Sequence, residues 1–321
     1  MESSRTWAGV GCGVAAGAIW GVVFLAPELV RGFTPLQIAA ARYVSYGLLA
    51  AVLVAPRRRR LTAMLDASAW RALAWLSLFG NVLYYVLLAT AVQLGGVAMT
   101  SLVMGFVPVA ITLIGSRDHG AVPLRRLAPS LALAVAGVAC VAWQSVGVGG
   151  PGTGTPAMRV AGFGAAVAAL VSWTGYAVGN SRWLARLGHV SAHDWNLLTG
   201  VVTGAQALLL AVPAFLFGPT GQAAAEWTTF AAVAIGLSIF ASLIASALWS
   251  RMSRLLPLTL VGQMILFETL FALLYGFLWE RRGPTPAEAA AMVLLVASVL
   301  SCLSAHAPAR EPVIVADPVH P

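Results

Sequence analysis

Residues 9–30 read GVGCGVAAGAIWGVVFLAPELV, and this apolar stretch decides the fold because it is long enough to cross a membrane. A helix needs about 20 apolar residues to cross roughly 30 Å of hydrocarbon. Comparable stretches follow along the chain and predict ten membrane-spanning helices, at 9–30, 35–55, 71–92, 95–116, 127–148, 160–181, 195–217, 228–250, 257–279 and 286–306. The sequence therefore predicts an all-α integral membrane protein.

The composition excludes an ordinary soluble protein. Of the 321 residues, 60% are hydrophobic and only 9% are charged, whereas soluble domains carry about 25% charged residues. All 19 basic residues are arginine, so P-loop chemistry and lysine Schiff bases are excluded. The arginines stand singly or in short runs between apolar stretches, a pattern that speaks against nucleic-acid binding.

Three cysteines, Cys12, Cys140 and Cys302, all lie inside apolar stretches. An odd number of cysteines in such positions favours small buried side chains over a disulfide framework or a metal site. We therefore expect neither a metal nor a cofactor.

The arginine distribution predicts the orientation in the membrane. Fourteen arginines flank one side of the predicted spans and four flank the other. Because positive charge concentrates on the cytoplasmic side, both termini are predicted to be cytoplasmic in a multi-pass protein of the cell (inner) membrane. Residues 307–321 are rich in proline and are predicted to form a disordered cytoplasmic tail.

An internal repeat divides the predicted spans into two halves. Residues 8–20 read AGVGCGVAAGAIW and residues 161–173 read AGFGAAVAALVSW, with identical residues at seven of thirteen positions. We therefore predict one five-helix repeat at 1–150 and a second at 151–306. Since five is odd, the two repeats cross the membrane in opposite senses, which is typical of carriers that work by alternating access.

Four short motifs carry a resemblance to a known family: Ile19-Trp20-Gly21, Ala41-Arg42-Tyr43, Val107-Pro108-Val109 and Phe267-Glu268-Thr269. In this order across two halves, they resemble the ten-helix drug/metabolite transporter superfamily and, within it, the EamA-type permeases. The resemblance implies a secondary transporter, commonly an exporter of small metabolites such as amino acids or amines. Its expected partners are a small-molecule substrate and the lipid bilayer, and no feature predicts an oligomeric state.

Glu268 is the acidic residue nearest the middle of a predicted span. An ionised carboxylate there costs several kcal/mol unless it is solvated or paired. It is therefore a candidate ligand for a substrate amine or for a coupling proton, and the alternative is a neutral acid that makes a packing hydrogen bond. Phe271 and Tyr275 follow at i+3 and i+7 and would share its face, while Gln263 lies on an adjoining face.

Aromatic residues deep inside other spans are further candidates for substrate binding. Trp20 and Trp173 occupy equivalent repeat positions away from the membrane interface that tryptophan prefers. They could line opposite walls of one cavity or could simply pack, and Tyr176 joins the face of Trp173. The third span adds a polar and aromatic stripe that should not face lipid, made of Asn81, Tyr84 and Tyr85.

Arg42 lies roughly 10 Å inside the second span and needs a partner or a route to water. Glu28, at the end of the first span, is the predicted partner. The pair could form an external gate, or Arg42 could belong to a static ion pair or extend its charge to the interface.

Local patterns also predict packing and helix starts. The first span has a glycine face, made of Gly9, Gly13, Gly17 and Gly21 at four-residue spacing, which predicts the close approach of another helix. Thr34 with Gln37, and Thr285 with Glu288, predict capping boxes at two helix starts.

Two other function classes fit less well. An intramembrane enzyme needs convergent reactive groups, but the sequence contains no His-Glu-x-x-His or Gly-x-Ser-x-Gly motif and no paired intramembrane aspartates. A channel usually shows rings of charge or repeated filter loops. One central acid in a two-half repeat favours a carrier.

Overall fold

The computed structural model describes residues 2–115, 124–146, 155–187, 190–256 and 258–306. Within these ranges the chain forms helices and no strand, which confirms the all-α prediction. The predicted tail at 307–321 lies outside the described residues.

The first part of the chain forms helices with these bounds: α1 (Glu2–Leu29), α2 (Pro35–Val54), η1 (Ala55–Arg57), α3 (Arg58–Ala63), α4 (Ala67–Ser77), η2 (Leu78–Leu83), α5 (Tyr84–Gly95), α6 (Val97–Met104), α7 (Val107–Gly115) and α8 (Leu124–Val146). The second part forms α9 (Pro156–Arg186), α10 (Ala192–Phe217), α11 (Ala224–Leu237), η3 (Ser238–Ile244), α12 (Ala245–Leu255), α13 (Leu258–Glu280) and α14 (Pro286–His306). Each predicted apolar stretch coincides with one helix or one run of successive helices, to within seven residues at its ends.

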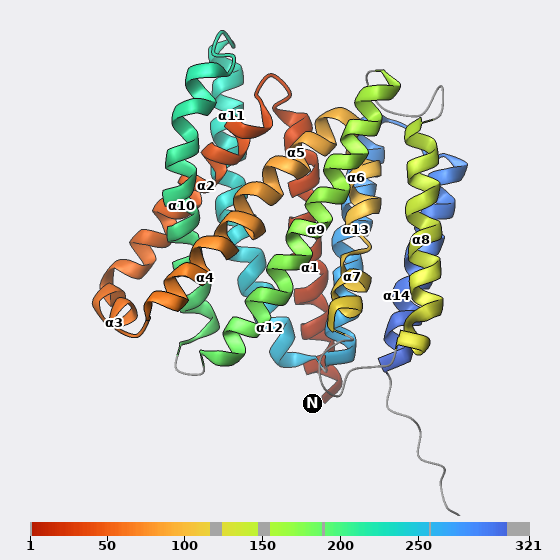
Figure 1. Ribbon diagram of the computed structural model, residues 1–321, viewed down its shortest axis with the longest axis horizontal. Coiled ribbons are helices and arrows are strands. Elements are labelled where there is room, and N and C mark those ends of the chain that lie inside the picture. Colours follow the sequence, from red (N-terminus) through yellow and green to blue (C-terminus); the bar gives the residue numbers. More distant parts are fainter. Residues whose placement is uncertain (1, 116–123, 147–154, 188–189, 257, 307–321) are drawn as a thin grey trace, which may run out of the picture.

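The helices run side by side and alternate in direction along the chain (Figure 1). The start of α1 and the end of α14 lie at the same end of the bundle, which we call the N-terminal end, and α3 lies there too. We call the opposite end the far end. The arginines of α3 therefore lie at the end of the bundle that holds the start of α1.

Many of these helices suit a membrane. Within the described residues, eight helical stretches are long and apolar enough to cross one: Thr6–Leu29, Pro35–Ala63, Ala67–Gly95, Val97–Ile114, Arg125–Gln144, Pro156–Arg186, Ala192–Phe217 and Ala224–Ser253. In α14 the stretch Pro286–Cys302 is apolar but shorter. The predicted multi-pass architecture is thus supported, while the count of ten spans stays a prediction.

Both predicted capping boxes are present. The Gln37 backbone N–H donates to Thr34 Oγ1 over 3.2 Å, and the Thr34 N–H donates to Gln37 Oε1 over 2.9 Å. The corresponding distances at Thr285 and Glu288 are 3.2 and 2.8 Å. These bonds satisfy backbone donors that the first helical turn leaves free.

Two long helices contain a π-helical segment. η2 separates α4 from α5, and η3 separates α11 from α12. A π-helical turn inserts an extra residue between hydrogen-bonding partners, which releases carbonyl oxygens from the regular α-helical pattern. These carbonyls become acceptors for side chains on neighbouring helices.

Glycines bring several helices into backbone contact. A Cβ added at Gly204 of α10 would lie 2.6 Å from the Cα of Gly47 of α2. A Cβ at Gly17 of α1 would lie 3.0 Å from the Glu268 nitrogen, and one at Gly21 would lie 2.9 Å from the Ala272 nitrogen. The predicted close approach to the glycine face of α1 is confirmed, and the approaching helix is α13.

Candidate substrate-binding site

Tyrosines from two helices meet in the largest buried cluster of the bundle. α2 supplies Tyr43 and Tyr46, and α5 supplies Tyr84 and Tyr85. No more than 8% of any of these residues is exposed, and Tyr176 of α9 packs against the cluster. The prediction that Tyr84 and Tyr85 do not face lipid is confirmed.

Asn81, the third member of the predicted stripe, lies in η2 and is half-buried. Its Nδ2 donates a hydrogen bond to Oγ1 of Thr203 on α10 over 3.0 Å. In this structure the Asn81 amide therefore joins two helices, and a contact between Asn81 and substrate stays a prediction.

Arg42 points into the tyrosine cluster. The central carbon of its guanidinium lies 4.2 Å from the centre of the Tyr85 ring and 5.1 Å from that of Tyr43. Only 7% of Arg42 is exposed. Its Nε and Nη1 have no hydrogen-bond partner within the described residues. The aromatic faces stabilise the cation but do not satisfy these donors.

Glu28 does not pair with Arg42, so the predicted ion pair is wrong. Glu28 forms an ion pair with Arg31, and Arg31 Nη2 donates to Glu28 Oε1 over 2.9 Å. Arg31 lies three residues after Glu28, and this short separation along the chain brings the two side chains together. Arg42 instead turns towards the aromatic rings, and an external gate formed by Glu28 and Arg42 is not present in this structure.

Glu268 lies in α13 where that helix meets the glycine face of α1, and its side chain is half-buried. The described part of the chain offers it no hydrogen bond or ion pair. Glu268 lies within electrostatic range of Tyr84, which places it beside the tyrosine cluster. The combination of partial access and no protein partner suits a carboxylate that meets a ligand.

Phe271 and Tyr275 share a face of α13, as the helical spacing predicts. Their ring centres lie 5.8 Å apart, and the Tyr275 hydroxyl donates to the Ala18 carbonyl over 3.2 Å. That bond joins α13 to α1. Gln263 also belongs to α13, but its side chain lies outside the described residues.

Trp20 and Trp173 are half-buried, and both pack against the hydrophobic core that contains the tyrosines. Trp20 Nε1 donates to the Ala241 carbonyl in η3 over 2.9 Å, and its ring centre lies 5.3 Å from that of Trp249. The Trp173 ring centre lies 6.2 Å from that of Tyr176. Both tryptophans therefore reach one central region, while the cavity that they were predicted to line stays a prediction.

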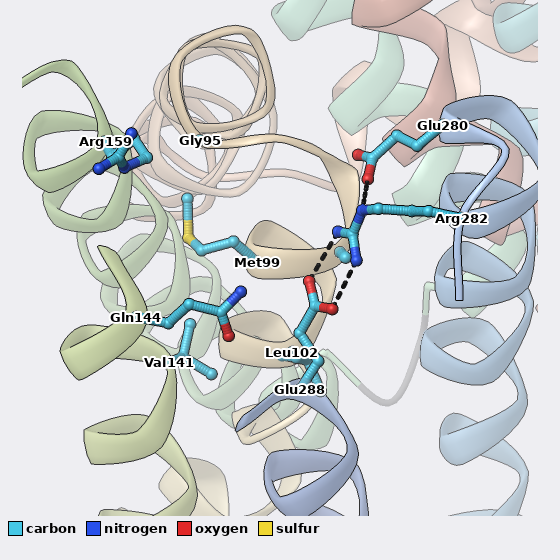
Figure 2. A pocket seen from close by; sticks show the side chains of 10 residues that line it. Gly95, Met99, Leu102, Val141, Gln144, Arg159, Glu280, Arg282 and Glu288 are labelled. Atoms are coloured by element: carbon cyan, nitrogen blue, oxygen red, sulfur yellow. Dashed lines mark hydrogen bonds and ion pairs between the residues drawn. The ribbon is translucent and has the colours of Figure 1, made fainter. Parts of the chain in front are cut away.

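A charged pocket at the far end of the bundle was missed from the sequence (Figure 2). It encloses about 380 Å³ of space, part of it open to solvent. The lining residues come from α5, α6, α8, α9, α14 and the end of α13: Gly95, Ala98, Met99, Leu102, Val141, Gln144, Arg159, Glu280, Arg282 and Glu288. No sequence pattern joins residues so far apart along the chain.

Arg282 is the hub of this pocket. Figure 2 shows its guanidinium between two carboxylates: Nε donates to Glu280 over 2.6 Å, and Nη1 and Nη2 donate to Glu288 over 2.6 and 2.7 Å. The hydrogen bond with Glu288 is the main reason that the pKa of the Arg282 guanidinium is raised above its ordinary value. Glu288 thus both caps α14 and ties α14 to the end of α13.

Arg282→Ala is expected to lower the free energy of unfolding by about 1–3 kcal/mol, because it removes charge-assisted hydrogen bonds from a side chain that is 25% exposed. Thermal unfolding of the purified protein in detergent measures this loss. The control is Arg281→Ala, which removes the same charge from the exposed neighbouring residue. Equal stability of the two variants would show that the network around Arg282 contributes nothing.

Comparisons with known proteins show which proteins this chain resembles. Residues 7–143 match the EamA-like transporter family. Over 313 residues the chain is 29% identical to inner membrane protein YtfF of Escherichia coli (strain K12), covering 92% of this chain and 95% of that protein. A solved structure, "Crystal structure of protein", is 21% identical and matches with a TM-score of 0.59, covering 91% of this chain and 96% of that chain. This last similarity shows a shared fold.

The family match confirms the resemblance to EamA-type permeases that the motifs indicated. The relationship to an inner membrane protein extends over nearly the whole length, and the apolar helices agree with it. The chain is therefore a multi-pass inner membrane protein whose residues 7–143 match the EamA-like transporter family.

Proposed function

We propose that this protein is a secondary transporter that exports small metabolites such as amino acids or amines by alternating access. The observation that carries the proposal is Glu268, a half-buried carboxylate on a membrane helix that has no partner within the described residues. A protein pairs or solvates such a group unless the group serves a ligand or a proton. The aromatic candidates would form the walls of the transport cavity: Trp20, Tyr84, Tyr85, Trp173, Tyr176, Phe271 and Tyr275.

Two matching hydrogen bonds support the inverted repeat. Trp20, from the first helix of the proposed first half, donates to the Ala241 carbonyl of η3 over 2.9 Å. Ser172, beside the equivalent Trp173 in the first helix of the second half, donates to the Phe79 carbonyl of η2 over 2.7 Å. Each donor thus reaches the π-helical segment of the opposite half, as expected for halves related by a two-fold axis.

Helix packing supports the same division at 1–150 and 151–306. α1 packs against α12 and α13, and α9 packs in the corresponding way against α5 and against α6 with α7. The remaining major contacts join α2 with α10 and α8 with α14, which are equivalent helices of the two proposed halves. Such a pairing gives two related packings around one centre, the geometry that alternating access requires.

We also propose that the N-terminal end of the bundle faces the cytoplasm, because the arginines of α3 lie there. In a background without the three native cysteines, Arg59→Cys is expected to react with a membrane-impermeant maleimide only from the cytoplasmic side. Gly283→Cys, at an exposed position between α13 and α14, is expected to react only from outside. The reverse pattern would overturn the orientation.

Counterflow in vesicles tests the proposed function. Purified protein is placed in vesicles loaded with one unlabelled amino acid or amine, and labelled compound is added outside. A carrier accumulates the label transiently, because outward-moving unlabelled substrate drives exchange. Equilibration without a transient accumulation would indicate a channel, and chemical conversion of the label would indicate an enzyme. Either result, or no movement of any compound tested, would contradict the proposal.

A further inference from the structure

We propose that the guanidinium of Arg42 is an anion-binding subsite and that the transported metabolite carries a carboxylate that Arg42 binds. This inference rests on the proposed function and adds a defined chemical group to the substrate. Nothing in the family match assigns a role to Arg42.

The first argument is the burial of an unbalanced charge. Arg42 is 7% exposed, and no ion pair involves it within the described residues. Its predicted partner Glu28 is bound to Arg31 instead. Burying a cation without an anion is costly. A ligand that supplies the missing negative charge would remove this cost when it binds.

The second argument is the geometry of the guanidinium. Tyr85 covers its flat face, with the ring centre 4.2 Å from the central carbon. The N–H groups of a guanidinium point outward in its plane, so a ring on the face leaves them available. Nε and Nη1 are two such donors without partners among the described residues. The δ-carbon lies on the Nη1 side of Nε, so these two donors do not form one fork, and each can donate separately to a carboxylate oxygen.

The third argument is the fixed position of Arg42. The Ser238 hydroxyl of η3 donates to the Arg42 carbonyl over 2.7 Å, which anchors the backbone. Tyr43 and Tyr85 hold the side chain from two helices. A donor that is already oriented loses little freedom when it binds.

The carboxylate of Glu268 is the nearby opposite charge, but it does not pair with Arg42. Tyr84 is within electrostatic range of both Arg42, a cation on α2, and Glu268, an anion on α13. No ion pair joins Arg42 to Glu268 in the described part of the chain. Two separated opposite charges suit a ligand that carries a carboxylate for Arg42 and an ammonium group for Glu268.

A matched set of ligands tests the subsite. Each common amino acid and its carboxamide are titrated against the purified full chain in detergent, and the thermal unfolding temperature reports binding. The two ligands share the side chain and the amine and differ in the negative charge. We expect at least one amino acid to bind the wild type roughly 10- to 100-fold more tightly than its carboxamide, the factor given by a charged hydrogen-bonded contact.

In Arg42→Gln this preference for the carboxylate is expected to disappear, and in Arg42→Lys it is expected to survive in part. Arg281→Gln, at the exposed end of α13, serves as the control and should keep the full preference. A preference that survives in Arg42→Gln would overturn the proposal. So would equal binding of acid and carboxamide to the wild type, or no binding of any amino acid to it.

The stability of Arg42→Met without ligand shows whether Arg42 serves a ligand or the packing of the protein. This measurement does not depend on any ligand titration. If Arg42 serves a ligand, Arg42→Met should be at least as stable as the wild type, because it removes an unpaired buried charge. A marked loss of stability would assign Arg42 to packing and overturn the proposal. Transport of simple amines with no contribution from Arg42 would remove only the subsite and would leave the proposed transporter intact.

Discussion

Glu268→Gln is expected to reduce gradient-driven transport by roughly 10-fold or more, the effect of losing one charged contact. If Glu268 meets water in one access state and aromatic residues in the other, the two states bind a proton or a substrate amine with different affinity. A ligand shifts a conformational equilibrium only through such a difference. An amide of nearly the same shape removes the charge and therefore removes the shift.

Two measurements on the same vesicles separate the roles of Glu268. If it only couples a proton, substrate exchange should survive in Glu268→Gln while uphill transport is lost. If it grips the substrate, binding and exchange should fall as well. Glu226→Gln, an equivalent change at an exposed position of α11, serves as the control and should transport normally. Wild-type rates of both processes in Glu268→Gln would leave only a packing role.

Gly17→Leu is expected to destabilise the protein by about 1–3 kcal/mol and to abolish transport. Any Cβ at this position would lie 2.8 Å from the Phe267 Cβ and 3.0 Å from the Glu268 nitrogen. Backbone atoms cannot rotate away as a flexible side chain can, so α1 and α13 must separate. The separation would also displace Glu268. Thermal unfolding and counterflow measure the two effects.

Gly11→Leu is the matched control on the same helix. Nothing lies within 4 Å of a Cβ built at Gly11. Since leucine favours a helix over glycine by up to about 1 kcal/mol, this variant should be as stable as the wild type or slightly more stable. Equal losses in the two variants would show that contact with α13 does not decide the role of Gly17.

The helices were largely predictable because each reflects local sequence. An apolar stretch of sufficient length forms a helix in a membrane irrespective of what surrounds it. The Thr34 and Thr285 capping boxes were predictable for the same reason, since their partners lie three residues away. The glycine face of α1 predicted a close neighbour, but only the fold shows that the neighbour is α13.

Pairings between distant residues were not predictable. Depth in the membrane predicts Arg42 as the partner of Glu28, but Arg31 binds Glu28 from the turn that follows α1. The local sequence predicts Glu288 as the capping residue of α14, which the structure confirms. It does not predict the ion pair between Glu288 and Arg282. One carboxylate can serve a cap and a distant arginine together, and a linear sequence shows only the first.

The π-helical segments η2 and η3 also lacked a sequence signal. Their residues are mostly apolar and fit an α-helix equally well. They join neighbouring helices through the backbone carbonyls of Phe79 and Ala241. Every residue type has a backbone carbonyl, so the sequence does not mark these acceptors. The structure identifies these acceptors through the donors Ser172 and Trp20.

The glycine face of α1 has one mechanical consequence. Its contacts with α13 recur every four residues, at Gly13 with Met264, at Gly17 with Phe267 and at Gly21 with Phe271. A displacement of α1 along α13 by one helical turn, about 5.4 Å, brings each glycine opposite the neighbouring contact. Intermediate displacements place backbone against side chains. Motion between these two helices would therefore occur in steps of one helical turn, and positions between two steps would be unfavourable.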